Sequence, residues 1–174
     1  FLCDLHAVDH PPNFDSTRRH FGDLLGWQQN AQRSRRWARK IWQGQQSLNR
    51  KKDPILQAKH FLNTWKKSDY DLPPVLDVER NARNDQELIS AMKKWLTYVE
   101  SKTGMRPIIY TSYYYFDSKF QNDFKNYKFW IAAYSKRPEK IEDSRIIHWQ
   151  FSEKGSLPGC ETRLDFNVSK IAFY

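Results

Sequence analysis

The 174-residue sequence has few of the residues that identify several classes of protein. Its two cysteines, Cys3 and Cys160, allow at most one disulfide, and it has no CxxC motif or Cys/His cluster of the kind that binds zinc. Six glycines and eight prolines are too few for a collagen-like or low-complexity chain. No run of about 18 apolar residues occurs, so we expect no membrane span. We also expect neither a metal site nor a cofactor.

The first residues of the chain lack a basic segment followed by a long apolar stretch. We therefore expect a signal peptide to be either absent or already removed, which leaves export of the protein open.

Basic and aromatic residues are plentiful. Lys+Arg 29 against Asp+Glu 20 gives a formal net charge of +9, which favours anionic partners or substrates. Phe, Trp and Tyr make up 16% of the chain. Aromatic rings beside carboxylates suit sugars, whose C–H faces stack on the rings, although any single aromatic residue is as readily explained by core packing.

The composition changes near residue 50. Residues 1–50 contain seven Arg and one Lys, whereas residues 51–174 contain six Arg and fifteen Lys, and no Glu occurs before Glu79. Six of the ten glutamines lie between Trp27 and Gln46, in a stretch with neither a helical nor a strand period. We therefore divide the chain into an atypical Arg/Gln-rich segment, residues 1–50, and a more regular part, residues 51–174.

Alternating helices and strands are predicted from Asp53 onward. Asp53 and Pro54 begin an amphipathic helix, and a second helix begins near Asp85 and ends at Gly104. Strands are predicted within 72–79, 106–112, 127–134, 145–152 and 162–170, with a short helix within 112–124. This order indicates an α/β barrel whose last part has lost its helices.

Asp77 and Glu79 are the most informative pair. They end a short apolar strand, and residues two apart in a strand point to the same face, so both carboxylates leave the strand end on one side. Repulsion between them favours one protonated and one ionised group, as glycoside cleavage requires. A metal site or surface acids are the alternatives for so short a motif.

Five further residues lie at or just after predicted strands. Asp165 is a third acid near the end of the last strand, where a turn or cap role is the alternative. For the aromatic residues the alternative is core packing, and for the glutamine a surface amide. These four candidates are Tyr110, Tyr134, Trp149 and Gln150.

Together these segments resemble the family 25 glycoside hydrolases, the lysozymes of the Chalaropsis type. The resemblance covers about residues 53–174. The matching text, in order, is LPPVLDVE, VESKTGMRPIIYTSYYYF, KFWIAAY, IIHWQFSEKGSLPG and RLDFNVSK.

The resemblance implies a modified TIM-type barrel of the (β/α)5(β)3 kind and cleavage of the β-1,4 bond between N-acetylmuramic acid and N-acetylglucosamine in peptidoglycan. It implies that Glu79 is the general acid/base, that Asp77 is the nucleophile or stabilising carboxylate, and that Asp165 orients substrate or tunes the pair. Whether a covalent adduct or the substrate's acetamido group is used stays open. Tyr110, Tyr134, Trp149 and Gln150 fall at positions that line the family's cleft, and the resemblance makes the catalytic barrel portion residues 51–174.

The first 50 residues depart from this pattern, because three strand motifs typical of the family are missing there. We expect the barrel to be incomplete or irregular at its N-terminal end. We hypothesise that this segment is not native sequence, through a frameshift or a wrongly chosen start.

The leading interpretation is a peptidoglycan hydrolase that acts outside the cell or in the cell envelope, with glycan strands as its partner. A catalytically impaired peptidoglycan-binding protein of the same fold is the main alternative. A chitinase-like family 18 hydrolase lacks support because Leu72 and Val75 stand where its first two acids would be. A nucleic-acid protein would rest only on the Arg-rich residues 33–39, and we expect no nucleic-acid partner.

Overall fold

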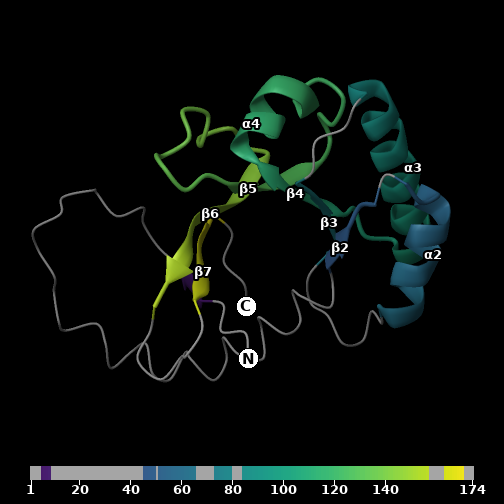
Figure 1. Cartoon of the computed structure of the whole chain (residues 1–174), viewed down its shortest axis with the longest axis horizontal. Helices are drawn as coiled ribbons and strands as arrows, with labels where there is room; N and C mark the ends of the chain where they lie inside the picture. Colours follow the sequence, from purple (N-terminus) through teal and green to yellow (C-terminus); the bar gives the residue numbers. More distant parts are fainter. Residues whose placement is uncertain are drawn as a thin grey trace, which may run out of the picture.

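The computed structural model has an α/β fold with one mixed sheet and helices on one side of it (Figure 1). It describes residues 5–8 (backbone only), 45–49, 51–65, 73–79, 84–156 and 163–170. Seven strands form the sheet in the order β1-β7-β6-β5-β4-β3-β2, and neighbouring strands run parallel except β6 and β7, which are antiparallel. Their bounds are β1 Leu5–Val8, β2 Gln45–Ser47, β3 Val75–Val78, β4 Ile108–Ser112, β5 Lys128–Ala132, β6 Ile146–Gly155 and β7 Leu164–Ser169.

The two ends of the strand order both come from the first 50 residues. β1 pairs with β7, and β2 pairs with β3, so the atypical segment contributes two short parallel strands. Within the described ranges β1 and β2 do not pair with each other, so the sheet is open there and the closed barrel stays a prediction. Residues 9–44, together with Cys3 and Cys160, lie outside the described residues.

Both long helices begin where the sequence predicts, and the second also ends there. α2 spans Pro54–Thr64, and its N-cap Asp53 accepts a hydrogen bond from the Leu56 amide at 2.8 Å. α3 spans Asp85–Thr103 and ends at Gly104, whose φ of 68° is the left-handed conformation that favours glycine. α2 and α3 lie side by side next to β2 and β3 (Figure 1). Neither is long and apolar enough to span a bilayer, and the same holds for the other helices within the described ranges.

The short helix predicted within 112–124 is present in two parts. α4 spans Tyr113–Tyr115, and a turn of π-helix, η3, continues it over Phe116–Phe120. The turn buries Phe116, whose ring meets that of Phe129 in β5 edge-on at 4.8 Å between centroids. This contact fixes the segment that follows β4 against the sheet.

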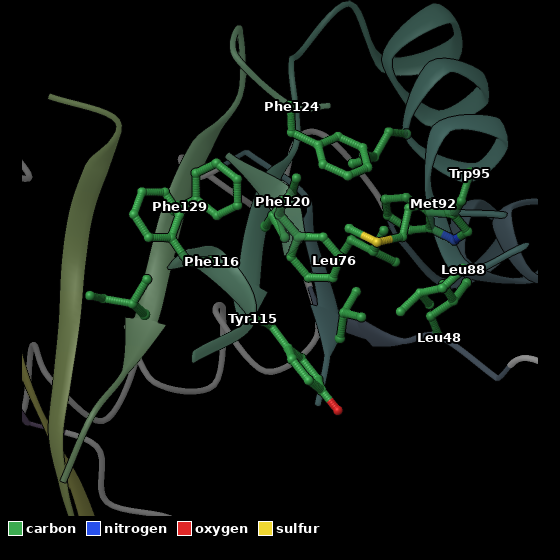
Figure 2. Packing of buried hydrophobic residues seen from close by; sticks show 14 of the residues in the cluster. Leu48, Leu76, Leu88, Met92, Trp95, Tyr115, Phe116, Phe120, Phe124 and Phe129 are labelled. Carbon is green, nitrogen blue, oxygen red and sulfur yellow. The ribbon is translucent and has the colours of Figure 1, made fainter. Parts of the chain in front are cut away.

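The core lies on two faces of the sheet, as alternation of side chains along a strand requires. On the helix side, Leu76 of β3 packs with Met92 and Trp95 of α3, and Phe116, Phe120, Phe124 and Phe129 extend the cluster along the sheet (Figure 2). The opposite face carries a smaller buried cluster, which comprises Val75, Ile108, Tyr110, Trp130, Ala132 and Ile147. The second face holds Tyr110, one of the candidate site residues.

Candidate active site

The two central carboxylates lie at the carboxyl end of β3. Asp77 is the third residue of the strand and is half-buried, and Glu79 follows the strand directly and is exposed. In the sheet, Asp77 lies opposite Ser47 of β2 on one side and Tyr110 of β4 on the other. Because β2, β3 and β4 are parallel, their carboxyl ends meet at one edge of the sheet. The short apolar strand thus presents its acids at the edge where parallel sheets hold their sites.

Tyr110 lies next to both carboxylates. It is buried, its hydroxyl donates a hydrogen bond to Gln150 Oε1 at 2.6 Å, and its ring packs edge-on against Trp130 at 5.2 Å between centroids. Burial raises the pKa of Tyr110 far above its ordinary value, and the nearby charges of Tyr134, Glu79 and Asp77 raise it further. The hydroxyl therefore keeps its proton and acts as a fixed hydrogen-bond donor.

Tyr134 connects the acids of β3 with those of the last strands. It follows β5 and is 46% exposed, which leaves much of its ring open to a ligand. Burial raises the pKa of Tyr134, a hydrogen bond with Tyr110 lowers it, and the charges of Glu153, Asp165 and Glu79 raise it. The charges of Glu79 after β3, Glu153 of β6 and Asp165 of β7 therefore all act on this one aromatic side chain.

Asp165 lies in β7 and is half-buried. Burial raises its pKa above the ordinary 3.8, a hydrogen bond with Gln150 lowers it, and the charge of Glu153 raises it. The Gln150 side chain, which belongs to β6, thus contacts both Tyr110 of β4 and Asp165 of β7. A buried amide with partners on both sides holds the two groups at a fixed separation.

Trp149 is the one predicted site residue that lies apart from this group. Its ring belongs to the helix-side core and is 9% exposed, and its Nε1 donates to the Ala133 carbonyl at 3.0 Å. Trp149 and Gln150 are adjacent in β6, so their side chains leave opposite faces of the strand. The structure brings together the other six, and a substrate contact by Trp149 stays a prediction.

Three residues that sequence reasoning missed support or extend the group. Trp130 Nε1 donates to Asn167 Oδ1 at 2.8 Å, which ties β5 to β7 beneath the ring of Tyr110. Glu153 adds a fourth carboxylate near Tyr134 and Asp165. Glu153 could have been noticed because it follows Gln150 by three residues. The direction of its side chain could not be predicted, because the pairing of β6 with β7 shifts in register between Gln150 and Ser152.

Across the part of the chain that the structure describes, no group of three or more His, Cys, Asp or Glu is placed to hold a metal ion. The arrangement instead combines half-buried and exposed carboxylates with a tyrosine hydroxyl that keeps its proton. Such a set can donate a proton to a leaving group and stabilise positive charge that develops on a sugar ring.

Comparisons with known proteins identify relatives of this chain. The profile of the family described as "Glycosyl hydrolases family 25" matches residues 27–160, so the match begins inside the atypical segment. The uncharacterized protein YegX of Escherichia coli O6:H1 is 35% identical over 114 residues, which are 65% of this chain and 42% of YegX. The chain therefore spans less than half the length of the curated relative it matches.

Two solved structures share the fold. A family 25 glycosyl hydrolase from Bacillus anthracis aligns with a TM-score of 0.65 and 21% identity, over 74% of this chain and 63% of that chain. The spore cortex lytic enzyme SleM from Clostridium perfringens aligns with a TM-score of 0.53 and 29% identity, over 66% of this chain and 43% of that chain. The first likeness supports the fold of the described sheet and helices.

Proposed function

Because this chain belongs to glycosyl hydrolase family 25, we propose that it is a peptidoglycan hydrolase that works through Asp77, Glu79 and Asp165. One observation carries the proposal. Acids far apart in the sequence converge on Tyr110 and Tyr134 at the carboxyl edge of the sheet, and there they form a polar site flanked by aromatic rings. Aromatic rings and carboxylates are what a glycan needs for stacking, for hydrogen bonding and for acid-catalysed cleavage.

The proposed bond is the β-1,4 linkage between N-acetylmuramic acid and N-acetylglucosamine. Glu79, exposed at the strand end, gives its proton to the departing oxygen and later takes one back from water. Asp77, half-buried within the strand, stabilises the positive charge of the sugar ring or attacks it as a nucleophile. Asp165, held by Gln150, orients the substrate or tunes the other two acids.

The aromatic residues have separate proposed roles. Tyr134 is exposed and stacks against a sugar ring, whereas the buried Tyr110 donates a hydrogen bond from its hydroxyl to Gln150 and so positions that amide. Gln150 acts through both Tyr110 and Asp165. Trp149 supports the cleft from behind through its bond to the Ala133 carbonyl.

Membership of the family also supports a proposal about the complete fold and the location of the protein. We propose that the sheet is part of a (β/α)5(β)3 barrel, that residues 51–174 carry its catalytic portion, and that the enzyme acts in the cell envelope or outside the cell. Two facts support this proposal: the family match and the parallel order of β2 to β6.

Substitution of the proposed acid tests the function. Glu79→Gln keeps the shape of the side chain but cannot deliver a proton, so we expect release of reducing ends from purified peptidoglycan to fall by about 10²- to 10⁴-fold. Co-sedimentation with the same peptidoglycan should stay near that of the parent. Glu139→Gln makes the same charge change at an exposed ion pair with Lys136 and should leave both readings unchanged.

The same assay separates the enzyme from a non-catalytic binder. If Glu79→Gln releases reducing ends at the parent's rate, Glu79 is not the general acid. If the parent chain sediments with peptidoglycan but releases no reducing ends, the protein is a binding protein of the same fold.

A further inference from the structure

A basic groove lies beside the candidate active site and takes no part in the proposed chemistry. It has a volume of about 980 Å³, in the range of sites for small ligands or short peptides. It is formed by the end of β2, the segment that follows and one side of α2. Its walls include Ser47, Asn49, Lys51, Lys52, Leu56 and His60.

The groove adjoins the catalytic carboxylates through the sheet. Ser47 lies directly opposite Asp77 in the β2–β3 ladder, and the Leu48 amide donates to the Asp77 carbonyl at 3.0 Å. Neighbouring strands are about 4.8 Å apart, so the groove begins one strand away from Asp77. A ligand bound at Asp77 and Glu79 can therefore reach the groove without leaving the carboxyl edge of the sheet.

The charge of the groove is set by two lysines without acidic partners. Some other surface cations of the described ranges are paired, as Lys93 is with Asp123 and Lys119 with Asp85, each at 2.6 Å. The ion pairs of these ranges do not include Lys51 or Lys52. The one acid of the groove, Asp53, is occupied as the cap of α2.

The segment that carries the lysines is held rigidly. Buried Gln57 of α2 accepts from the Asn49 amide at 2.7 Å and donates to the carbonyls of Asn49 at 2.8 Å and Lys52 at 3.0 Å. The Asn49 side chain accepts from the Lys51 amide at 3.0 Å. A segment fixed in this way loses little conformational entropy when a ligand binds, so the cationic surface is preorganised.

We propose that this groove binds the acidic peptide stem that the muramic acid residues of peptidoglycan carry, an inference that rests on the proposed function. Lys51 and Lys52 face the stem's carboxylates, and Leu56, which is 64% exposed, contacts its small apolar side chains. The groove thereby selects glycan that still bears peptide over bare glycan. Anionic phosphate polymers of the wall share the charge but lack the apolar side chains that Leu56 would contact.

Binding to two forms of one ligand tests this inference. The first is a soluble glycan fragment with acidic stem peptides, and the second is the same fragment after an amidase has removed them, which leaves the lactyl carboxylates in place. Both are titrated by calorimetry into the Glu79→Gln chain, so that neither is cleaved. We expect the stem-bearing fragment to bind about tenfold more tightly.

Substitution of both lysines, Lys51→Gln with Lys52→Gln, should abolish that tenfold preference and leave the affinity for the stripped fragment unchanged. Lys102→Gln with Lys125→Gln is the matched control, because it removes the same charge from exposed positions in the last turn of α3 and in the segment before β5, toward the opposite edge of the sheet. The control should keep the preference. The midpoint of thermal unfolding of each variant checks that the fold is intact.

Three results would overturn the inference: a chain that shows no stem preference, a preference that survives in the Lys51/Lys52 variant, or an equal loss in the control. Displacement of the stem-bearing fragment by oligomeric glycerol phosphate but not by free stem peptide would assign the groove to a phosphate polymer instead. Hydrolysis is read separately. Stem preference without reducing-end release by the parent would contradict the proposed function alone, and release without preference would contradict the groove alone.

Discussion

Asp165 shows how burial and hydrogen bonding act against each other on one carboxyl group. Burial raises its pKa and the bond with Gln150 lowers it, with a net rise above the ordinary 3.8. Between the ordinary pKa of the unfolded chain and the raised pKa of the folded chain, the folded chain binds more protons than the unfolded chain. The contribution of Asp165 to stability is therefore largest at acid pH and declines as the pH rises through that window.

Replacing the carboxyl group should remove this pH dependence. Asp165→Asn keeps an acceptor for Gln150 but has no charge to bury, so its free energy of unfolding relative to the parent should increase from about pH 3 to about pH 7. Urea unfolding at several pH values measures the difference. A difference that is constant across this range would show that burial of the Asp165 charge has no influence on folding.

Gln150 illustrates why a residue's place in the sequence does not reveal its partners. The sequence predicts that Gln150 lies at or just after a strand, and it therefore predicts that Gln150 belongs to the site. Its bonds to Tyr110 of β4 and Asp165 of β7 depend on how three strands align, and no local pattern encodes that alignment. The same alignment sends adjacent Trp149 to the helix side.

Single elements differ in how far the sequence predicts them. α2 and α3 could be predicted with their caps because helix periodicity and capping are local. β1 and β2 could not, since Gln45–Ser47 is short and polar and becomes a strand through its pairing with β3. The pairing of β6 with β5 shifts in register between Phe129 and Trp130 of β5, and its pairing with β7 shifts between Gln150 and Ser152. These shifts break the alternation from which side-chain direction is inferred.

The cap of α3 gives a prediction at the scale of one element. The Asn84 side chain accepts hydrogen bonds from the amides of Gln86 at 2.9 Å and Glu87 at 3.5 Å. Asn84→Ala leaves these amides without that acceptor and should lower the free energy of unfolding by about 1 kcal/mol, as measured by urea denaturation. Ser90→Ala, at an exposed position within the same helix, should change it by less than about 0.5 kcal/mol. Equal effects of the two substitutions would mean that the cap contributes nothing.

At the scale of the whole molecule, the two described stretches of the first 50 residues, 5–8 and 45–49, join the sheet. β1 and β2 extend the sheet at both ends, and Leu48, just after β2, is buried in the core with Leu76 and Leu88 (Figure 2). The family match also begins at residue 27. If residues 1–50 are not native sequence, their two strands in parallel register still need an explanation. Translation of the coding DNA in its other two frames tests this hypothesis directly.

The net charge of +9 gives the last prediction, because it acts on the whole encounter between this chain and the anionic glycan proposed as its substrate. Attraction to an anionic polymer raises the rate of association over a distance set by the screening length, about 30 Å at 0.01 M salt and about 8 Å at 0.15 M. Hydrolysis of soluble stem-bearing glycan should therefore lose roughly tenfold in kcat/KM across this range, whereas kcat, which follows binding, should change little. A parallel fall in kcat would place the salt effect in the active site, and a kcat/KM that is independent of salt would show that the net charge does not guide the enzyme to its substrate.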